Sequence, residues 1–312
     1  MPPLLTMLKS YGPDLPYAVR FVRSYEQHLQ DDIPLVVVVP RDDLGAFRGA
    51  LGTGHEFVVE EEFGRHLVDR TIHGNSAGYM NQQIIKLAFA ELGIADNYLC
   101  ADSDAVLVRP FGAGDFMADT NTPFTFLTED AELQVEPQYY REYWADRDRM
   151  LVGLREYLGL PGHPYATCHN MAVFSGVVLA SLREFLAERD LTYADALEIC
   201  PYEFSWYNFW LERQGGIPRV VREPIFKMIH SSSQHLEYVL KGVSIDDIAR
   251  GYVGLIVNSG YSRQFGLVDF DEPRYRALGQ YLNHRELGRA FALRCTRKAP
   301  RVQRWLGLSR RG

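Results

Sequence analysis

Short aliphatic runs alternate along the chain with longer segments in which apolar residues recur every three to four positions. The runs have the length of strands, whereas residues 18–30 and 41–51 have helical spacing. Near-continuous aliphatic strands are typical of parallel sheets that helices cover on both faces. The pattern therefore predicts one α/β domain with a mostly parallel central sheet flanked by helices. The predicted strands are Leu35–Val39, Phe57–Glu60, Tyr98–Ala101, Phe124–Thr128 and Met171–Leu179.

Residues 78–93 are predicted to form a helix that leads into the third of these strands. Its aliphatic residues gather on one side of a helical wheel, and Gln82 and Lys86, four residues apart, share the opposite side. One interpretation is a solvated helix face. The other is that both side chains contribute to a site, because the strand that follows ends in charged residues.

Two aspartates, Asp102 and Asp104, follow the strand Tyr98–Ala101 with only Ser103 between them. A single aspartate at a strand end is a common turn residue. Two at spacing i, i+2 point to the same face of an extended chain, so their carboxylates become neighbours. Neighbouring carboxylates repel unless they share a proton or a cation lies between them. The pair therefore indicates a proton-sharing dyad or a divalent-metal site.

The charge of the chain is unevenly distributed. The 312 residues carry a formal net charge of -7, but residues 281–312 hold nine Lys and Arg against one acidic residue, a net charge of +8. Residues 1–280 then hold 24 basic and 39 acidic residues, a net charge of -15. We therefore expect a domain at 1–280 that does not bind nucleic acid, and a separate basic helical tail at 281–312.

The composition favours a cytoplasmic protein. No apolar run approaches the roughly 20 residues that span a bilayer, and the first residues do not resemble a signal peptide. The cysteines form no C-x-x-C pair, which favours reduced, buried thiols over a zinc site or a disulfide framework. They are Cys100, Cys168, Cys200 and Cys295.

Several short motifs carry a resemblance to a known family. They are Lys9-Ser10-Tyr11 with Asp14, Gln82-Gln83 with Lys86-Leu87, Asp102-Ser103-Asp104 with Arg109-Pro110, TCHNMAVFSG at 167–176 and EFSWY at 203–207. With these motifs the chain resembles the GT-A glycosyltransferases, especially a bacterial family of uncharacterised glycosyltransferase-like proteins. The resemblance covers roughly residues 5–235, and it implies a GT-A, Rossmann-like fold.

The resemblance also implies a reaction. In such enzymes the two carboxylates, here Asp102 and Asp104, hold Mn²⁺ or Mg²⁺ against the diphosphate of a nucleotide-sugar donor, and the ion stabilises the charge on the departing nucleoside diphosphate. A histidine from late in the chain often completes the metal shell, and His230 is the candidate. The donor site is expected to include Lys9, Tyr11, Gln82, Gln83, Lys86 and Ser103.

The acceptor, a glycan or glycolipid, is expected to contact a second group of residues. Glu203 lies in the aromatic stretch CPYEFSWYNFW, where it is the candidate general base if the enzyme inverts the anomeric centre. The alternative is an aromatic core helix with one exposed acid. His169 and Asn170 are candidates for bonding sugar hydroxyls, although they could equally end a strand.

The sequence also fits two other functional classes and a location at the membrane surface. ADSDAVLV also fits the nucleophile strand of haloacid-dehalogenase-type phosphatases, with Asp246 and Asp247 as the acidic pair for Mg²⁺. A non-catalytic sugar-nucleotide binding protein would use the same fold. The basic tail, with Trp305 among its apolar residues, could lie peripherally on the inner face of the cell membrane, or fold back on the acidic domain, or be disordered.

Overall fold

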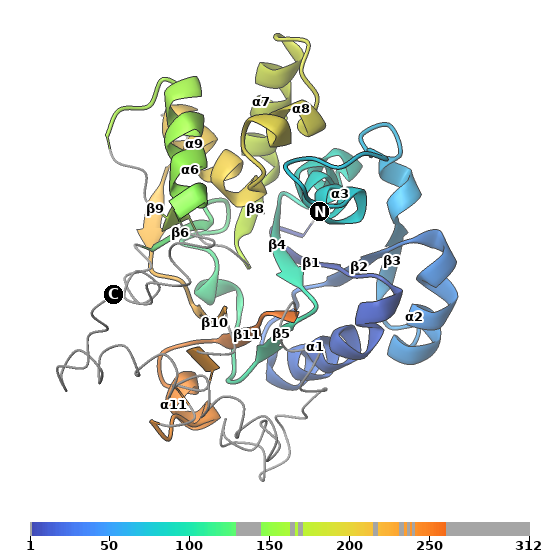
Figure 1. Ribbon diagram of the computed structural model, residues 1–312. Helices are drawn as coiled ribbons and strands as arrows, with labels where there is room; N and C mark the ends of the chain where they lie inside the picture. The colour runs from blue at the N-terminus through green and yellow to red at the C-terminus, as the bar shows by residue number, and fades with distance from the viewer. Residues whose placement is uncertain are drawn as a thin grey trace, which may run out of the picture.

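The computed structural model has a mostly parallel central sheet with helices on both faces, as the alternating pattern predicts (Figure 1). The part of the chain after residue 259 lies outside the described residues. The residues that the structure describes are 2–128, 145–162, 166–167, 171–214, 218–230, 234–235, 238 and 241–259.

 The helical tail predicted at 281–312 is therefore not among the described residues.

Within the described residues, five strands form the central sheet in the order β3-β2-β1-β4-β8. The strands β1, β2, β3 and β4 are mutually parallel where they pair, and β8 is antiparallel to β4. All residues of β1 and β2 are buried, because helices cover both faces. The strand bounds are β1 Leu5–Lys9, β2 Leu35–Val39, β3 Glu56–Val59, β4 Asn97–Asp102 and β8 Val173–Ser175.

The helices form a layer on each side of this sheet. Figure 1 shows α1 (Leu15–His28) and α2 (Leu44–Leu51) on one side, and α3 (Ala77–Ala88) with α7 (Gly176–Ala187) and α8 (Tyr193–Ile199) on the other. The helices α6 (Ala145–Tyr157) and α9 (Glu203–Gln214) extend the second layer. Caps fix where helices begin: Ser76 accepts a hydrogen bond from the backbone of Tyr79 at the start of α3.

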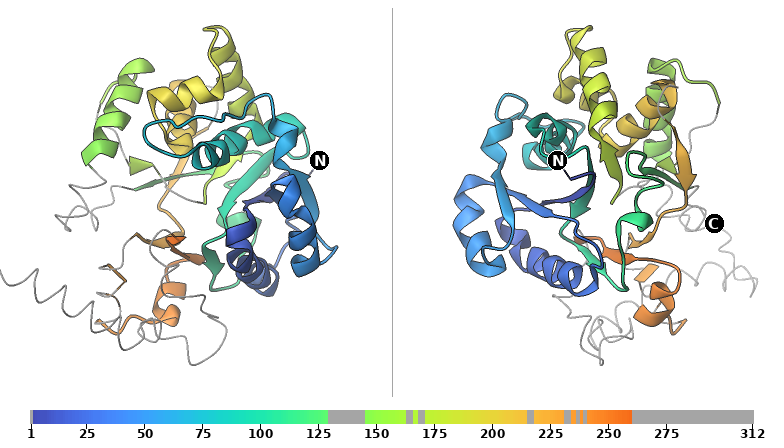
Figure 2. Two further views of the ribbon diagram at one scale, coloured as in Figure 1. Left: turned by 45° about the vertical axis from the view of Figure 1, so that its right-hand side comes forward. Right: turned by 180° about the vertical axis from the view of Figure 1, so that it is seen from behind.

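Two smaller sheets, again counted over the described residues, adjoin the central one. One has the order β10-β11-β5, with β10 Phe226–Ile229, β11 Gly254–Val257 and β5 Ala105–Leu107. It lies beside α1 in both views of Figure 2, and the backbone N–H of Leu107 donates to Ser24 Oγ of that helix. The other contains β7 Ala166–Thr167, β6 Phe124–Thr128 and β9 Val220–Arg222.

The turn between β4 and β5 connects the central sheet to the β10-β11-β5 sheet. It consists of Ser103 and Asp104, and it leads from β4 of the central sheet into β5 of the smaller sheet. The backbone N–H of Val257 in β11 donates to the carbonyl of Asp104 at 3.3 Å. The chain thus passes from one sheet to the other at the aspartate motif.

Three of the predicted strands differ from the observed ones. The strand predicted at Tyr98–Ala101 is one residue longer at each end, Asn97–Asp102. The run Met171–Leu179 was expected to be one strand, but only Val173–Ser175 is extended and Gly176 begins α7. A Cβ at Gly176 would lie 3.1 Å from the carbonyl oxygen of Asp96, so this close approach favours glycine at the turn. The strand predicted at Phe57–Glu60 begins and ends one residue earlier, at Glu56–Val59, and Glu60 starts a 3-10 helix.

Candidate functional site

The strand order reverses at β1, whose neighbours β2 and β4 lie on opposite sides. Lys9, the last residue of β1, is in register with Asp102, the last residue of β4. At such a reversal the connections leave in opposite directions and open a crevice at the carboxyl ends of the strands. A pocket of about 660 Å³ lies there, a volume within the usual range for small-molecule sites.

Ten of the residues expected at the site line this one pocket. They are Lys9, Tyr11, Gln82, Gln83, Lys86, Asp102, Ser103, Asp104, Glu203 and His230. The two remaining candidates, His169 and Asn170, lie outside the described residues. These ten side chains therefore lie around one pocket. Their roles stay predictions.

The two aspartates have different surroundings. Asp104 lies in the turn after β4, so the alternation of strand side chains does not by itself explain why both carboxylates face the pocket. Its Oδ2 accepts a hydrogen bond from the backbone N–H of Ser259 at 2.9 Å. Its Oδ1 is buried and has no hydrogen-bond partner among the described residues. Burial, together with the charge of Asp102, raises the pKa of Asp104 to about 6.

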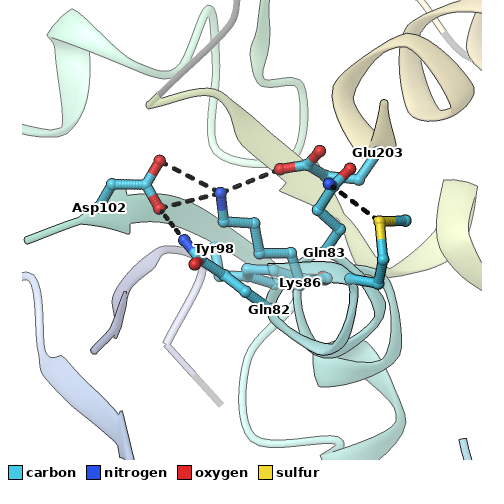
Figure 3. A network of polar contacts seen from close by, with 7 residues as sticks. Gln82, Gln83, Lys86, Tyr98, Asp102 and Glu203 are labelled. Atoms are coloured by element: carbon cyan, nitrogen blue, oxygen red, sulfur yellow. Dashed lines mark hydrogen bonds and ion pairs between the residues drawn. The ribbon is translucent and has the colours of Figure 1, made fainter. Parts of the chain in front are cut away.

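Lys86 lies at the centre of a buried network of polar side chains (Figure 3). Its Nζ is 2.9 Å from Oδ1 and 3.2 Å from Oδ2 of Asp102, and 2.9 Å from Oε1 of Glu203. Burial alone lowers the pKa of Lys86, but the charges of the two carboxylates outweigh this effect and raise it. The interpretation of this helix side as a solvated face is wrong, because Lys86 is only 3% exposed.

The glutamines of α3 hold the same two carboxylates. Gln82 Nε2 donates to Oδ1 of Asp102 at 3.0 Å. The amide of Gln83 is drawn in Figure 3 with its nitrogen toward Met80, at 3.9 Å from the sulfur. In the flipped orientation that nitrogen lies 2.8 Å from Oε2 of Glu203, and we assign this orientation because its neighbours there are acceptors. The side of α3 that faces the pocket therefore binds Asp102 and Glu203 together.

Glu203 begins α9, whose aromatic residues are buried in the core. The alternative of an aromatic core helix is correct for the helix, but the acid is not exposed: Glu203 is only 6% exposed. The ring of Phe204 lies 4.9 Å from the Lys86 ammonium, which adds a cation–π contact. The start of α9 thus brings a carboxylate and an aromatic ring to the same lysine.

Lys9 pairs with a carboxylate that follows β3, two strands away in the sheet. Its ammonium forms an ion pair with Glu60 and donates to the carbonyl of Ser10 at 2.7 Å. Burial lowers the pKa of Lys9, and Glu60 offsets this effect only in part. The hydroxyl of Ser10 is buried without a hydrogen-bond partner among the residues described. Glu60 was not predicted as a site residue, although its place at the end of a predicted strand could have suggested it.

Other lining residues were also missed. Tyr79 is half exposed at the start of α3, and Arg147 of α6 stacks on Tyr202, with its guanidinium carbon 4.2 Å from the ring centre. Asp14 lines the pocket as well; it belongs to the first motif but was not proposed for the site. No local pattern marks Arg147 or Tyr202, because helix packing brings them to the pocket.

The chemistry of the two aspartates suits a divalent ion. Asp104 Oδ1 is an acceptor without a partner in the described part of the chain, beside a second carboxylate. His230 lines the same pocket, yet no three His, Cys, Asp or Glu side chains of the described residues are grouped to hold a metal. Magnesium is commonly held by one or two carboxylates with substrate phosphates and water. Asp102 and Asp104 are therefore the residues that would hold such an ion, should one bind together with a phosphate.

The residues of the phosphatase interpretation do not assemble. Asp246 and Asp247 are exposed in α11 (Ile245–Ala249), and neither lines the pocket. Asp247 accepts hydrogen bonds from Ser244, which caps this helix. A structural role thus accounts for Asp247.

The cysteines that the structure describes are free and buried. Burial raises the thiol pKa of Cys100, and that of Cys200 to about 12, so both stay protonated near neutral pH. Cys168 and Cys295 lie outside the described residues. Among the helices described, none combines the length and the apolar character needed to cross a bilayer.

Comparison with known proteins finds one family without an assigned role. Residues 14–152 match the model of a family of unknown function (DUF6492). The matched part runs from Asp14, directly before α1, into α6, so it includes Lys86 and both aspartates but not Lys9 or Glu203. No curated protein matches the chain.

Proposed function

We propose that the protein transfers a sugar from a nucleotide-diphosphate sugar to a glycan or glycolipid acceptor, with Mn²⁺ or Mg²⁺ as cofactor. One observation carries the proposal: Asp102 and Asp104 line one pocket at the reversal of the strand order, and an oxygen of Asp104 there has no partner among the described residues. The resemblance of the surrounding motifs to GT-A glycosyltransferases supports the same reaction class.

The residues of the pocket would have different roles in the reaction. Asp102 and Asp104 would hold the divalent ion, which supplies stabilisation for the negative charge on the departing diphosphate. Lys86 and Gln82 orient Asp102 through the contacts described above. Lys9 and Tyr11 line the nucleotide end, at the carboxyl end of β1. His230, in the same pocket, is retained as a candidate ligand.

Glu203 is the candidate base for the acceptor hydroxyl in an inverting reaction. Its carboxylate is held by Lys86 and Gln83, which fixes its position. A retaining reaction would need no such base, and Glu203 would then only position Lys86. His169 and Asn170 stay predicted acceptor contacts.

The test combines binding and turnover. A thermal-shift panel of nucleoside diphosphates and their sugars, with and without Mn²⁺, should identify a donor that stabilises the protein, by about 2.7 kcal/mol at 100 times its dissociation constant. Asp104→Asn should abolish metal-dependent transfer while it leaves the fold intact. Asp69→Asn, an exposed residue outside the pocket, is the matched control.

Three outcomes would change the proposal. Full transfer by Asp104→Asn, or in EDTA, would refute the metal-dependent mechanism. Donor binding without transfer to any acceptor would favour a sugar-nucleotide binding protein. Hydrolysis of simple phosphoesters that is lost in Asp102→Asn would favour the phosphatase class.

The basic tail at 281–312 is proposed to contact an anionic membrane surface at which a lipid-linked acceptor would be met. Each Lys or Arg near such a surface contributes about 1 kcal/mol, and salt screens the attraction. Co-sedimentation with anionic liposomes at low and high salt tests this contact. A full-length protein that stays in the supernatant at low salt would refute it.

A further inference from the structure

The oxygens of Asp102 are already occupied by donors of the protein itself. Oδ1 receives Lys86 at 2.9 Å and Gln82 at 3.0 Å, and Oδ2 receives Lys86 at 3.2 Å. In contrast, Oδ1 of Asp104 has no hydrogen-bond partner within the described residues. A divalent ion bound by both aspartates would therefore have to share or displace the ammonium at Asp102.

The ammonium has a second carboxylate to which it can remain bound. Lys86 Nζ lies 2.9 Å from Oε1 of Glu203, and the ring of Phe204 lies 4.9 Å away. The backbone of the lysine is fixed as well, because the hydroxyl of Tyr98 donates to its carbonyl at 2.6 Å. A small movement of the ammonium from Asp102 toward Glu203 would free an oxygen of Asp102 without leaving the lysine unpaired.

We propose that Lys86 is a built-in competitor of the divalent ion for Asp102, so that the pocket takes up the ion together with a diphosphate rather than alone. The inference rests on the proposed function and deepens it by giving an order of binding. A diphosphate supplies oxygen ligands and negative charge, which offset the repulsion between the ion and the ammonium. Lys86 is thus a positioning residue that sets when the ion binds.

The experiment measures Mn²⁺ binding to the full chain without nucleotide, by the electron paramagnetic resonance signal of free Mn²⁺. Lys86→Met removes the competing charge and should bind Mn²⁺ at least about tenfold more tightly than the wild type, a change of about 1.4 kcal/mol. A merely structural role would not increase metal affinity. Lys241→Met, at an exposed lysine outside the pocket, should bind Mn²⁺ as the wild type does.

A second variant keeps the test decisive if Lys86→Met does not fold. Gln82→Leu removes the other donor to Asp102 and should tighten Mn²⁺ binding about twofold or more, because it frees one acceptor site while the lysine stays. Unchanged or weaker Mn²⁺ binding in whichever of the two variants folds would overturn the inference.

The result separates this inference from the proposed function. Tighter Mn²⁺ binding by Lys86→Met, with no donor or transfer found for the wild type, would support the competition and refute the transferase. Transfer by the wild type, with no change of Mn²⁺ affinity in Lys86→Met, would support the transferase and refute the competition.

Discussion

Removing the Lys86 ammonium should strongly destabilise the protein even though one substitution changes few contacts. Lys86→Met keeps the unbranched side chain but leaves the Asp102 and Glu203 carboxylates near one another without their shared cation. Each 2.9 Å contact corresponds to about 6 kcal/mol at an effective dielectric constant of about 20. Desolvation cancels much of this in the intact pair, but the loss of one partner of a buried pair costs about 3–5 kcal/mol.

The assay is a double-mutant cycle with Glu203→Gln. We expect Lys86→Met to lower the free energy of unfolding by about 3–5 kcal/mol, and the midpoint by about 6–20 °C for a domain of this size. The double variant should recover part of the loss, with a coupling energy of about 1–3 kcal/mol, because only one charged carboxylate then remains. Lys241→Met is the matched control. A Lys86→Met midpoint within about 2 °C of the wild type, or strictly additive losses, would refute the reasoning.

Two further predictions concern a titration and a packing contact. Because the folded state raises the pKa of Asp104 to about 6, the wild type without metal should lose stability relative to Asp104→Asn as pH rises from 4 to 7. The free energy of unfolding of the wild type, measured by urea denaturation, should fall by about 3 kcal/mol relative to that of Asp104→Asn. A difference between the two proteins that does not vary with pH would contradict this prediction. Gly254→Ala should lower the free energy of unfolding by about 1–3 kcal/mol, because the new Cβ would lie 2.3 Å from the ring of Phe226 in the fold as it stands. Gly251→Ala, where a Cβ meets nothing within 4 Å, is its control, and equal losses would refute the packing argument.

The sequence predicts the purely aliphatic strands well and misses the one at the centre of the sheet. Leu35–Val39 has the same bounds in the structure as in the prediction, because a continuous aliphatic run needs no partner to be recognised. Leu5–Lys9 was not predicted, since Thr6 and Lys9 interrupt its pattern. In the structure Thr6 bonds the hydroxyl of Tyr25 at 3.0 Å, and Lys9 pairs with a glutamate. These partners come from tertiary packing, which a local pattern does not contain.

The candidate site likewise combines features that the local sequence contains with contacts that only tertiary packing makes. The aspartate pair could be predicted, because a strand end and a two-residue spacing are local features. The bond between Lys86 and Glu203 could not, because 117 residues separate them and α9 has to pack on α3 before they meet. The motif resemblance predicts Lys86 at the donor, whereas its observed ion pairs are with two carboxylates.

The turn at Asp104 has a mechanical consequence, because it belongs to the pocket and connects two sheets. Its carboxylate receives the Ser259 N–H just beyond β11, and its carbonyl receives that of Val257 within β11. A ligand held at Asp104 therefore stabilises a contact between parts of the chain that could otherwise open separately. Amide protons of β4 and β11 should then slow their exchange with solvent together when the pocket is filled, so that two local units behave as one cooperative unit.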